Sequence, residues 1–309
     1  MAPVRESTGG RTRRPDPGRD PDSPARRSGP APLPAERSRV SAIVPRPYRP
    51  IRPLPRAHLA AALAAAALSI VAPTAASTRV AAAADLVYAL DEIAAGYRAA
   101  TGRDVAIAYG SSGQFAQQIE NGAPFELFLS ADESYVERLA ARGLTRDRGE
   151  IYAVGRLALF VPHGSPLSLD PSLADLRSAA ADGRLVRFAI ANPEHAPYGR
   201  AARQALVSAG ALDAVEPRLV LGESAAQAMR FATAGAQGGL VPWPLAQAPE
   251  AARRGRAVLV PAALHAPLRQ RMVLTRRAGP DAERFRDWIR TPVARAILVK
   301  HGFEAPDGR

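Results

Sequence analysis

Residues 109–132, YGSSGQFAQQIENGAPFELFLSAD, are the stretch that decides the fold. They follow a short apolar run, residues 105–108, which predicts a buried strand; the residue types then predict a glycine-serine turn, a helix and a second strand. Ser112 is the expected N-cap of this helix, and Phe115 and Ile119 mark its apolar face. The first amides of such a helix have no partner within it, and the helix dipole adds positive charge at that end. The turn therefore suits a small anion, although a turn that only caps a helix is the simpler alternative.

The turn lacks the patterns of two common catalytic loops. No lysine follows the glycines, so it is not a P-loop, and it lacks the Gly-x-Ser-x-Gly spacing of a nucleophile elbow. A ligand would be held by neutral donors. One catalytic alternative stays open, a serine hydrolase using Ser111 or Ser112 with His195, but the sequence offers no recognisable third member of a triad.

The strongly basic composition is located mainly in the first quarter of the chain. The net charge is +12 over 309 residues, and residues 1–76 hold 13 of the 41 Lys and Arg but 5 of the 29 Asp and Glu. Residues 77–309 therefore carry only +4. A nucleic-acid-binding protein is the alternative that this charge raises, and its location argues against it. The chain has no cysteine, which excludes disulfides and thiolate metal sites.

The first 76 residues divide into two parts. Residues 1–56 are rich in Pro, Arg and Ser, so we expect them to be disordered or to precede the true translation start. Residues 57–76 have the form of an export signal, with Arg52 and Arg56 ahead of an apolar run and small residues suited to cleavage near Ala76. This signal predicts a periplasmic protein.

The rest of the chain alternates strands and helices. Three strand-helix units in succession predict a parallel sheet covered by helices, with ligands at the carboxyl ends of its strands. Residues 152–161 predict one long apolar strand, interrupted by Gly155, which could cross from one lobe to another. We expect two α/β lobes, residues 77–155 with 261–309 and residues 156–260, with at least four strand-to-helix turns facing one cleft.

Four segments and their order carry a family resemblance. The runs AAAADLVYALDEIA, GSSGQFAQQIENGAPFELFLSAD, ANPEHAPYGRAA and GESAAQA, followed by a closing HGF, resemble the periplasmic molybdate-binding proteins of ABC transporters, the ModA group, over residues 79–304. The resemblance implies the two-lobed periplasmic-binding-protein fold of type II, in which each lobe is a mostly parallel sheet flanked by helices and the ligand lies in the interlobe cleft. It implies a non-enzymatic protein without a cofactor, which captures molybdate or tungstate and delivers it to an ABC permease. Its contact with the membrane would be only through the permease. Another oxyanion, such as sulfate or thiosulfate, remains an alternative cargo.

The resemblance also implies the site. The oxyanion is expected to be held by hydroxyls and backbone amides, with no protein side chain bound directly to the metal. Carried over position by position, the implied residues are Ala84, Asp85, Ser111, Ser112, Tyr198 and Ala225.

Two positions depart from the family pattern. Several members have Ser where this chain has Asp85, and a carboxylate about 4 Å from an anion costs on the order of 4 kcal/mol per charge at an effective dielectric near 20. We therefore expect the Asp85 side chain to cap its own helix while its amide contacts the ligand. Some members place a Tyr hydroxyl where Pro242 stands, and its loss removes a contact worth roughly 1.5 to 3 kcal/mol.

Three further residues have structural explanations. His195 is expected to be a loop residue bonded to the backbone. Trp243 is expected to pack between the lobes rather than line the cleft, and Asp132 to lie at a turn or a helix end.

Overall fold

The structure, a computed structural model, describes residues 77–306 of the 309-residue chain. The two predicted N-terminal segments, residues 1–56 and 57–76, lie outside the described residues. In the part of the chain that the structure describes, no helix has the length and apolar character needed to cross a membrane.

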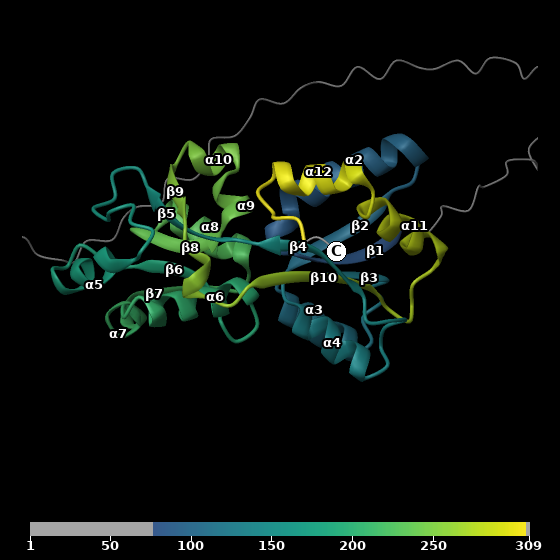
Figure 1. The fold of residues 1–309 in the computed structure, drawn as a ribbon, viewed down its shortest axis with the longest axis horizontal. Coiled ribbons are helices and arrows are strands. Elements are labelled where there is room, and N and C mark those ends of the chain that lie inside the picture. Colours follow the sequence, from purple (N-terminus) through teal and green to yellow (C-terminus); the bar gives the residue numbers. More distant parts are fainter. Residues whose placement is uncertain (1–76, 307–309) are drawn as a thin grey trace, which may run out of the picture. The chain divides into compact units, whose positions relative to one another are not determined.

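The first sheet has five strands in the order β2-β1-β3-β10-β4, of which β10 alone runs against its neighbours. Its strands are β1 (Thr78–Ala83), β2 (Val105–Gly110), β3 (Leu127–Ser130), β4 (Glu150–Gly155) and β10 (Leu268–Leu274). Figure 1 shows α2, α11 and α12 on one face of this sheet and α3 and α4 on the other. The segments that cover it are η1 (Ala84–Leu86), α2 (Val87–Thr101), α3 (Ser112–Glu120), α4 (Glu133–Ala141), α11 (Pro280–Ile289) and α12 (Pro292–Lys300).

The second sheet repeats this plan in the order β7-β6-β8-β5-β9, and β5 is its antiparallel strand. Its strands are β5 (Leu157–Pro162), β6 (Phe188–Ala191), β7 (Leu219–Gly222), β8 (Gly238–Pro242) and β9 (Gly255–Leu259). Figure 1 shows α6 and α7 on one side of this sheet and α9 and α10 on the other. The helical segments here are α5 (Ala174–Ala181), α6 (Pro197–Ser208), α7 (Leu212–Val215), η2 (Glu216–Arg218), α8 (Ala225–Ala234), α9 (Trp243–Ala246), α10 (Pro249–Ala252) and η3 (Ala262–Leu264).

The cores explain why these segments fold as they do. Strands β3, β6 and β8 are buried along their whole length, as expected for parallel strands covered on both faces. Helix α2 buries Leu90, Ile93 and Tyr97, which recur at helical spacing, and it ends at Gly102, whose φ of 70° is the left-handed conformation that glycine adopts without strain. The predicted two-lobed fold, with a mostly parallel sheet in each lobe, is confirmed.

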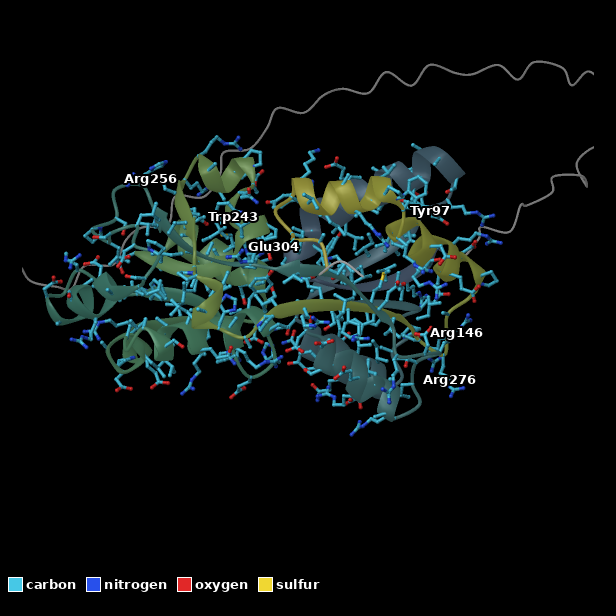
Figure 2. The ribbon with its side chains drawn as sticks, viewed as in Figure 1. Tyr97, Arg146, Trp243, Arg256, Arg276 and Glu304 are labelled. Carbon is cyan, nitrogen blue, oxygen red and sulfur yellow. The ribbon has the colours of Figure 1, made fainter. Side chains whose placement is uncertain are left out.

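The chain crosses from the first sheet to the second at a single residue and returns over residues 260–267. The run predicted as one strand over residues 152–161 is two strands, β4 and β5, separated by Arg156. The Arg156 guanidinium pairs with Glu304, whose backbone forms a two-way bridge with Val154, and the Arg156 carbonyl accepts the Trp243 amide at 2.8 Å. Figure 2 shows Trp243 and Glu304 beside this junction. Trp243 packs against the hydrophobic core and lies beside Gly302 of the first lobe, which fits the predicted packing between the lobes.

Candidate functional site

Helix α3 begins where the first lobe touches the second. Its N-cap is Ser111, one residue before the predicted Ser112, because the Ser111 backbone is extended while Ser112 is already helical. The Ser111 hydroxyl does not cap the helix in the usual way: it donates to the carbonyl oxygen of His195, which belongs to the loop before α6, at 2.6 Å. The predicted turn therefore contacts the opposite lobe through a side chain.

The His195 carbonyl accepts three hydrogen bonds from the first lobe. Besides Ser111, the Gly113 amide donates at 3.0 Å and the Tyr135 hydroxyl at 3.1 Å. Gly113 is needed for this approach, because a Cβ there would lie 2.5 Å from the same carbonyl oxygen. The partial negative charge of the carbonyl thus sits at the positive end of α3.

The His195 ring extends the same contact. Since the Ser111 hydroxyl gives its only hydrogen to a carbonyl, the ring Nδ1, 2.9 Å from Ser111 Oγ, must be the donor of that pair. The ring Nε2 lies 3.2 Å from Glu223 Oε2, which also accepts from the Gln114 side chain at 3.0 Å. The prediction that this histidine bonds to backbone is wrong, because side chains from both lobes surround its ring.

Arg200 forms another polar contact between the lobes. Its guanidinium pairs with Asp132 and donates to the Tyr135 hydroxyl, and it lies 4.9 Å from the centre of the Tyr135 ring. Asp132 also caps α4 by accepting from the Ser134 amide at 2.8 Å, which confirms its predicted place at a helix end. The pair is partly buried, with 34% of the Arg200 side chain and 28% of the Asp132 side chain exposed.

Ser112 uses its hydroxyl oxygen as a hydrogen-bond acceptor. It is buried, and its Oγ accepts the Ala131 amide at 3.0 Å, so its own hydrogen is left for a second partner.

Tyr198 and Ala225 lie in the first turns of α6 and α8. Tyr198 follows Pro197 at the start of α6, and Ala225 follows Ser224, which accepts the Gln227 amide at 3.3 Å and so confirms the predicted cap. Both residues are buried. Helix α8 also contacts η1, the short helix that holds Ala84 and Asp85.

The Asp85 side chain is buried in a polar cluster. It was predicted to cap its own helix, and this is wrong: the carboxylate instead accepts the side-chain amide of Gln270, a residue of β10. The Gln270 carbonyl oxygen in turn accepts the Tyr152 hydroxyl at 2.7 Å. Gly155 makes room for this cluster, because a Cβ there would clash with the Tyr198 hydroxyl and the Gln270 amide.

Burial dominates the protonation of the cluster. It raises the pKa of Asp85 to about 6, against the opposing effect of hydrogen bonds from Gln270 and Tyr198. Burial, followed by the nearby Asp85 charge, also raises the pKa of Tyr152 and of Tyr198 well above the usual range. Both tyrosines are therefore neutral at physiological pH.

Pro242 ends β8 and is the N-cap of α9. The first α9 amide, that of Trp243, is already bonded to the Arg156 carbonyl. The structure therefore agrees with the expectation that this turn supplies neither a hydroxyl nor an amide at position 242.

The structure links the predicted turns in pairs. The α3 turn meets the loop before α6 through His195, and η1 meets α6 through the Asp85 cluster. The sequence interpretation missed Gln270. Its available signal was its place between Arg269 and Arg271 in a strand, since alternation puts a lone Gln on the face opposite two Arg side chains. Within residues 77–306, no group of three or more His, Asp or Glu residues could hold a metal ion.

Comparisons with known proteins identify the family. The family model described as bacterial extracellular solute-binding protein matches residues 78–304. The chain is 38% identical over 216 residues to the molybdate-binding protein ModA of Rhodobacter capsulatus, covering 69% of this chain and 82% of that one. It is 35% identical over 250 residues to ModA of Azotobacter vinelandii, covering 80% and 96%. The solved periplasmic molybdate-binding protein of Azotobacter vinelandii matches with a TM-score of 0.66 at 32% identity, covering 75% of this chain and all of that one. The chain therefore belongs to the bacterial extracellular solute-binding proteins and, among them, to the ModA family.

Proposed function

We propose that this protein binds molybdate, with tungstate as a second cargo, and delivers it to an ABC permease from the periplasm. Two relatives that match this chain over most of their own length are molybdate-binding proteins. The observation that carries the proposal is the meeting of the α3 and α6 starts across the lobes, where the Gly113 amide reaches the His195 carbonyl at 3.0 Å.

The donors at these turns suit a tetrahedral dianion. The proposed contacts are the backbone amides of Ala84, Asp85, Tyr198 and Ala225 and the amides and hydroxyls of the Ser111–Ser112 turn. Of the two hydroxyls, Ser112 is the stronger candidate, because its hydrogen is free to point at a ligand while that of Ser111 is given to His195. Backbone amides donate hydrogen bonds and do not accept them, and the Ser112 oxygen already accepts the Ala131 amide. A site built from such donors favours a fully deprotonated anion over one that carries a proton.

Calorimetry with molybdate, tungstate, sulfate and phosphate tests the proposal directly. Tight binding of molybdate with weak or absent binding of sulfate is the expected result. Tight binding of sulfate alone would instead assign the protein to the sulfate or thiosulfate alternative. Binding of none of the four anions would refute an oxyanion site.

The hydrolase alternative has one observation in its favour and one against it. Ser111, His195 and Glu223 form a continuous chain of contacts that has the order of a catalytic triad. However, the Ser111 hydrogen goes to a carbonyl oxygen, and the imidazole acts as donor to the Ser111 oxygen, so the ring is not placed to take a proton from it. We therefore expect no labelling by a fluorophosphonate probe. Covalent modification of Ser111 would revive the alternative.

A further inference from the structure

Asp85 is a buried acid without a cationic partner among the described residues. Only 1% of the residue is exposed, and Gln270, a neutral side chain, donates to one carboxylate oxygen. The other oxygen, Oδ1, and the Tyr198 hydroxyl are both buried and make no hydrogen bond of good geometry among residues 77–306, although the hydroxyl lies close enough to the carboxylate to oppose the rise of its pKa. A carboxylate in such a place lacks the compensation that buried charges normally require.

The charged side chains on neighbouring elements are engaged elsewhere or exposed. On β10, Arg269 and Arg271 flank Gln270 in the chain but both pair with Glu133. On α6, Arg200 pairs with Asp132 and Arg203 with Glu216. On β4, Glu150 pairs with Arg290, and on β2 the Tyr109 hydroxyl donates to Asp91. Arg230 of α8 is exposed. The titratable groups that face Asp85 are therefore the two neutral tyrosines, Tyr152 and Tyr198.

The same short helix carries this acid and two proposed anion contacts. The amides of Ala84 and Asp85 belong to η1, and the Tyr198 hydroxyl that approaches the acid belongs to a residue whose amide is a third proposed contact. A dianion at these amides would add negative charge close to a carboxylate that has no counter-ion. The repulsion disappears if the carboxylate is protonated.

We propose that Asp85 takes up one proton when the oxyanion binds, so that the affinity for the anion depends on pH. This inference rests on the proposed function. With a pKa of about 6 before binding, about half of the protein has a neutral Asp85 at pH 6 and about one hundredth at pH 8. If only the neutral form binds, the apparent affinity for molybdate falls about 50-fold between these pH values.

Calorimetry on the wild-type protein provides a test that needs no variant. Titrations with molybdate at pH 7.5 in two buffers with different ionisation enthalpies, neither of them phosphate, count the protons taken up. We expect close to one proton per anion. The Asp85→Asn variant should take up none and should bind molybdate with nearly the same affinity at pH 6 and pH 8. Asp213→Asn, which removes an exposed acid on α7, is the matched control and should behave like the wild type.

The outcomes separate the two proposals. Molybdate binding without proton uptake, at an affinity equal at pH 6 and pH 8, would overturn the role of Asp85 and leave the proposed function standing. A proton uptake that persists in Asp85→Asn would also overturn it, because another group would then take up the proton. Absence of molybdate binding to the wild type and to Asp85→Asn at every pH would overturn the proposed function, and this inference with it.

Discussion

Replacing Asp85 by Asn should stabilise the unliganded protein, and more so at higher pH. Burial raises the pKa of Asp85 from 3.8 to about 6, so the folded protein holds this proton more tightly than the unfolded chain does. The sign follows from this. Below pH 3.8 the acid is neutral in both states and costs nothing, whereas above pH 6 the folded state must hold the charge in a dry site.

The size of the effect follows from the same shift. A difference of about two pKa units corresponds to about 3 kcal/mol at pH 7, of which about 1 kcal/mol is already present at pH 4.5. Asn keeps an oxygen that accepts from the Gln270 amide and carries no charge. The advantage of Asp85→Asn over the wild type should therefore grow by about 2 kcal/mol between pH 4.5 and pH 7.

Thermal unfolding followed by circular dichroism measures this difference. For a protein of this size, 2 kcal/mol corresponds to a change of roughly 4 to 8 °C in the gap between the two melting temperatures. Asp213→Asn should show a gap that does not change with pH in this way. A gap for Asp85→Asn that stays constant, or that narrows as the pH rises, would show that the carboxylate is paired or solvated in the folded protein.

Three further changes test the site and the contact between the lobes. Ser112→Ala should weaken molybdate binding by roughly 1.5 to 3 kcal/mol, because a hydrogen bond to a charged ligand is lost; an unchanged affinity in calorimetry would count against this serine. Arg200→Gln should speed release of the anion about fivefold in stopped-flow fluorescence, since it removes about 1 kcal/mol of contact with Asp132 across the lobes. An unaltered release rate would show that this pair does not hold the lobes together. Gly155→Ala should lower the melting temperature, at a cost of about 1 to 3 kcal/mol, because its methyl group overlaps the Tyr198 hydroxyl; a melting temperature equal to that of the wild type would exclude the clash.

The fold was predictable because its signals are local. The glycine-serine turn, the apolar runs and the cap at Ser224 each depend on residues within a few positions of one another, so the sequence alone places the strands and the helix starts. The errors at this level are small. The cap of α3 lies one residue earlier than predicted, at Ser111, because the extended backbone of the strand continues to this residue. The Ser111 hydroxyl contacts the other lobe.

The partners of the site residues were not predictable in the same way. Asp85 and Gln270 are 185 positions apart, and Ser111 and His195 are 84 apart. No spacing rule connects such residues, because the first contact depends on the strand order within one sheet and the second on how the two lobes meet. The expectation that Asp85 caps its own helix assumed that its carboxylate accepts from the nearby amides of that helix. In the folded protein it accepts from the side-chain amide of Gln270 instead.

The single-residue connection at Arg156 limits how the protein can move. Because β4 ends at Gly155 and β5 begins at Leu157, the chain has no slack there, and at this crossing any opening of the lobes must be taken up by a few backbone torsions. The returning crossing, residues 260–267, is longer. Such a connection permits rotation about a defined axis but not the free tumbling of two domains on a tether. A flexible insertion after Arg156 would leave each core intact, yet it would add a loop-closure entropy that grows with the logarithm of its length. Closure of the lobes would then cost additional free energy.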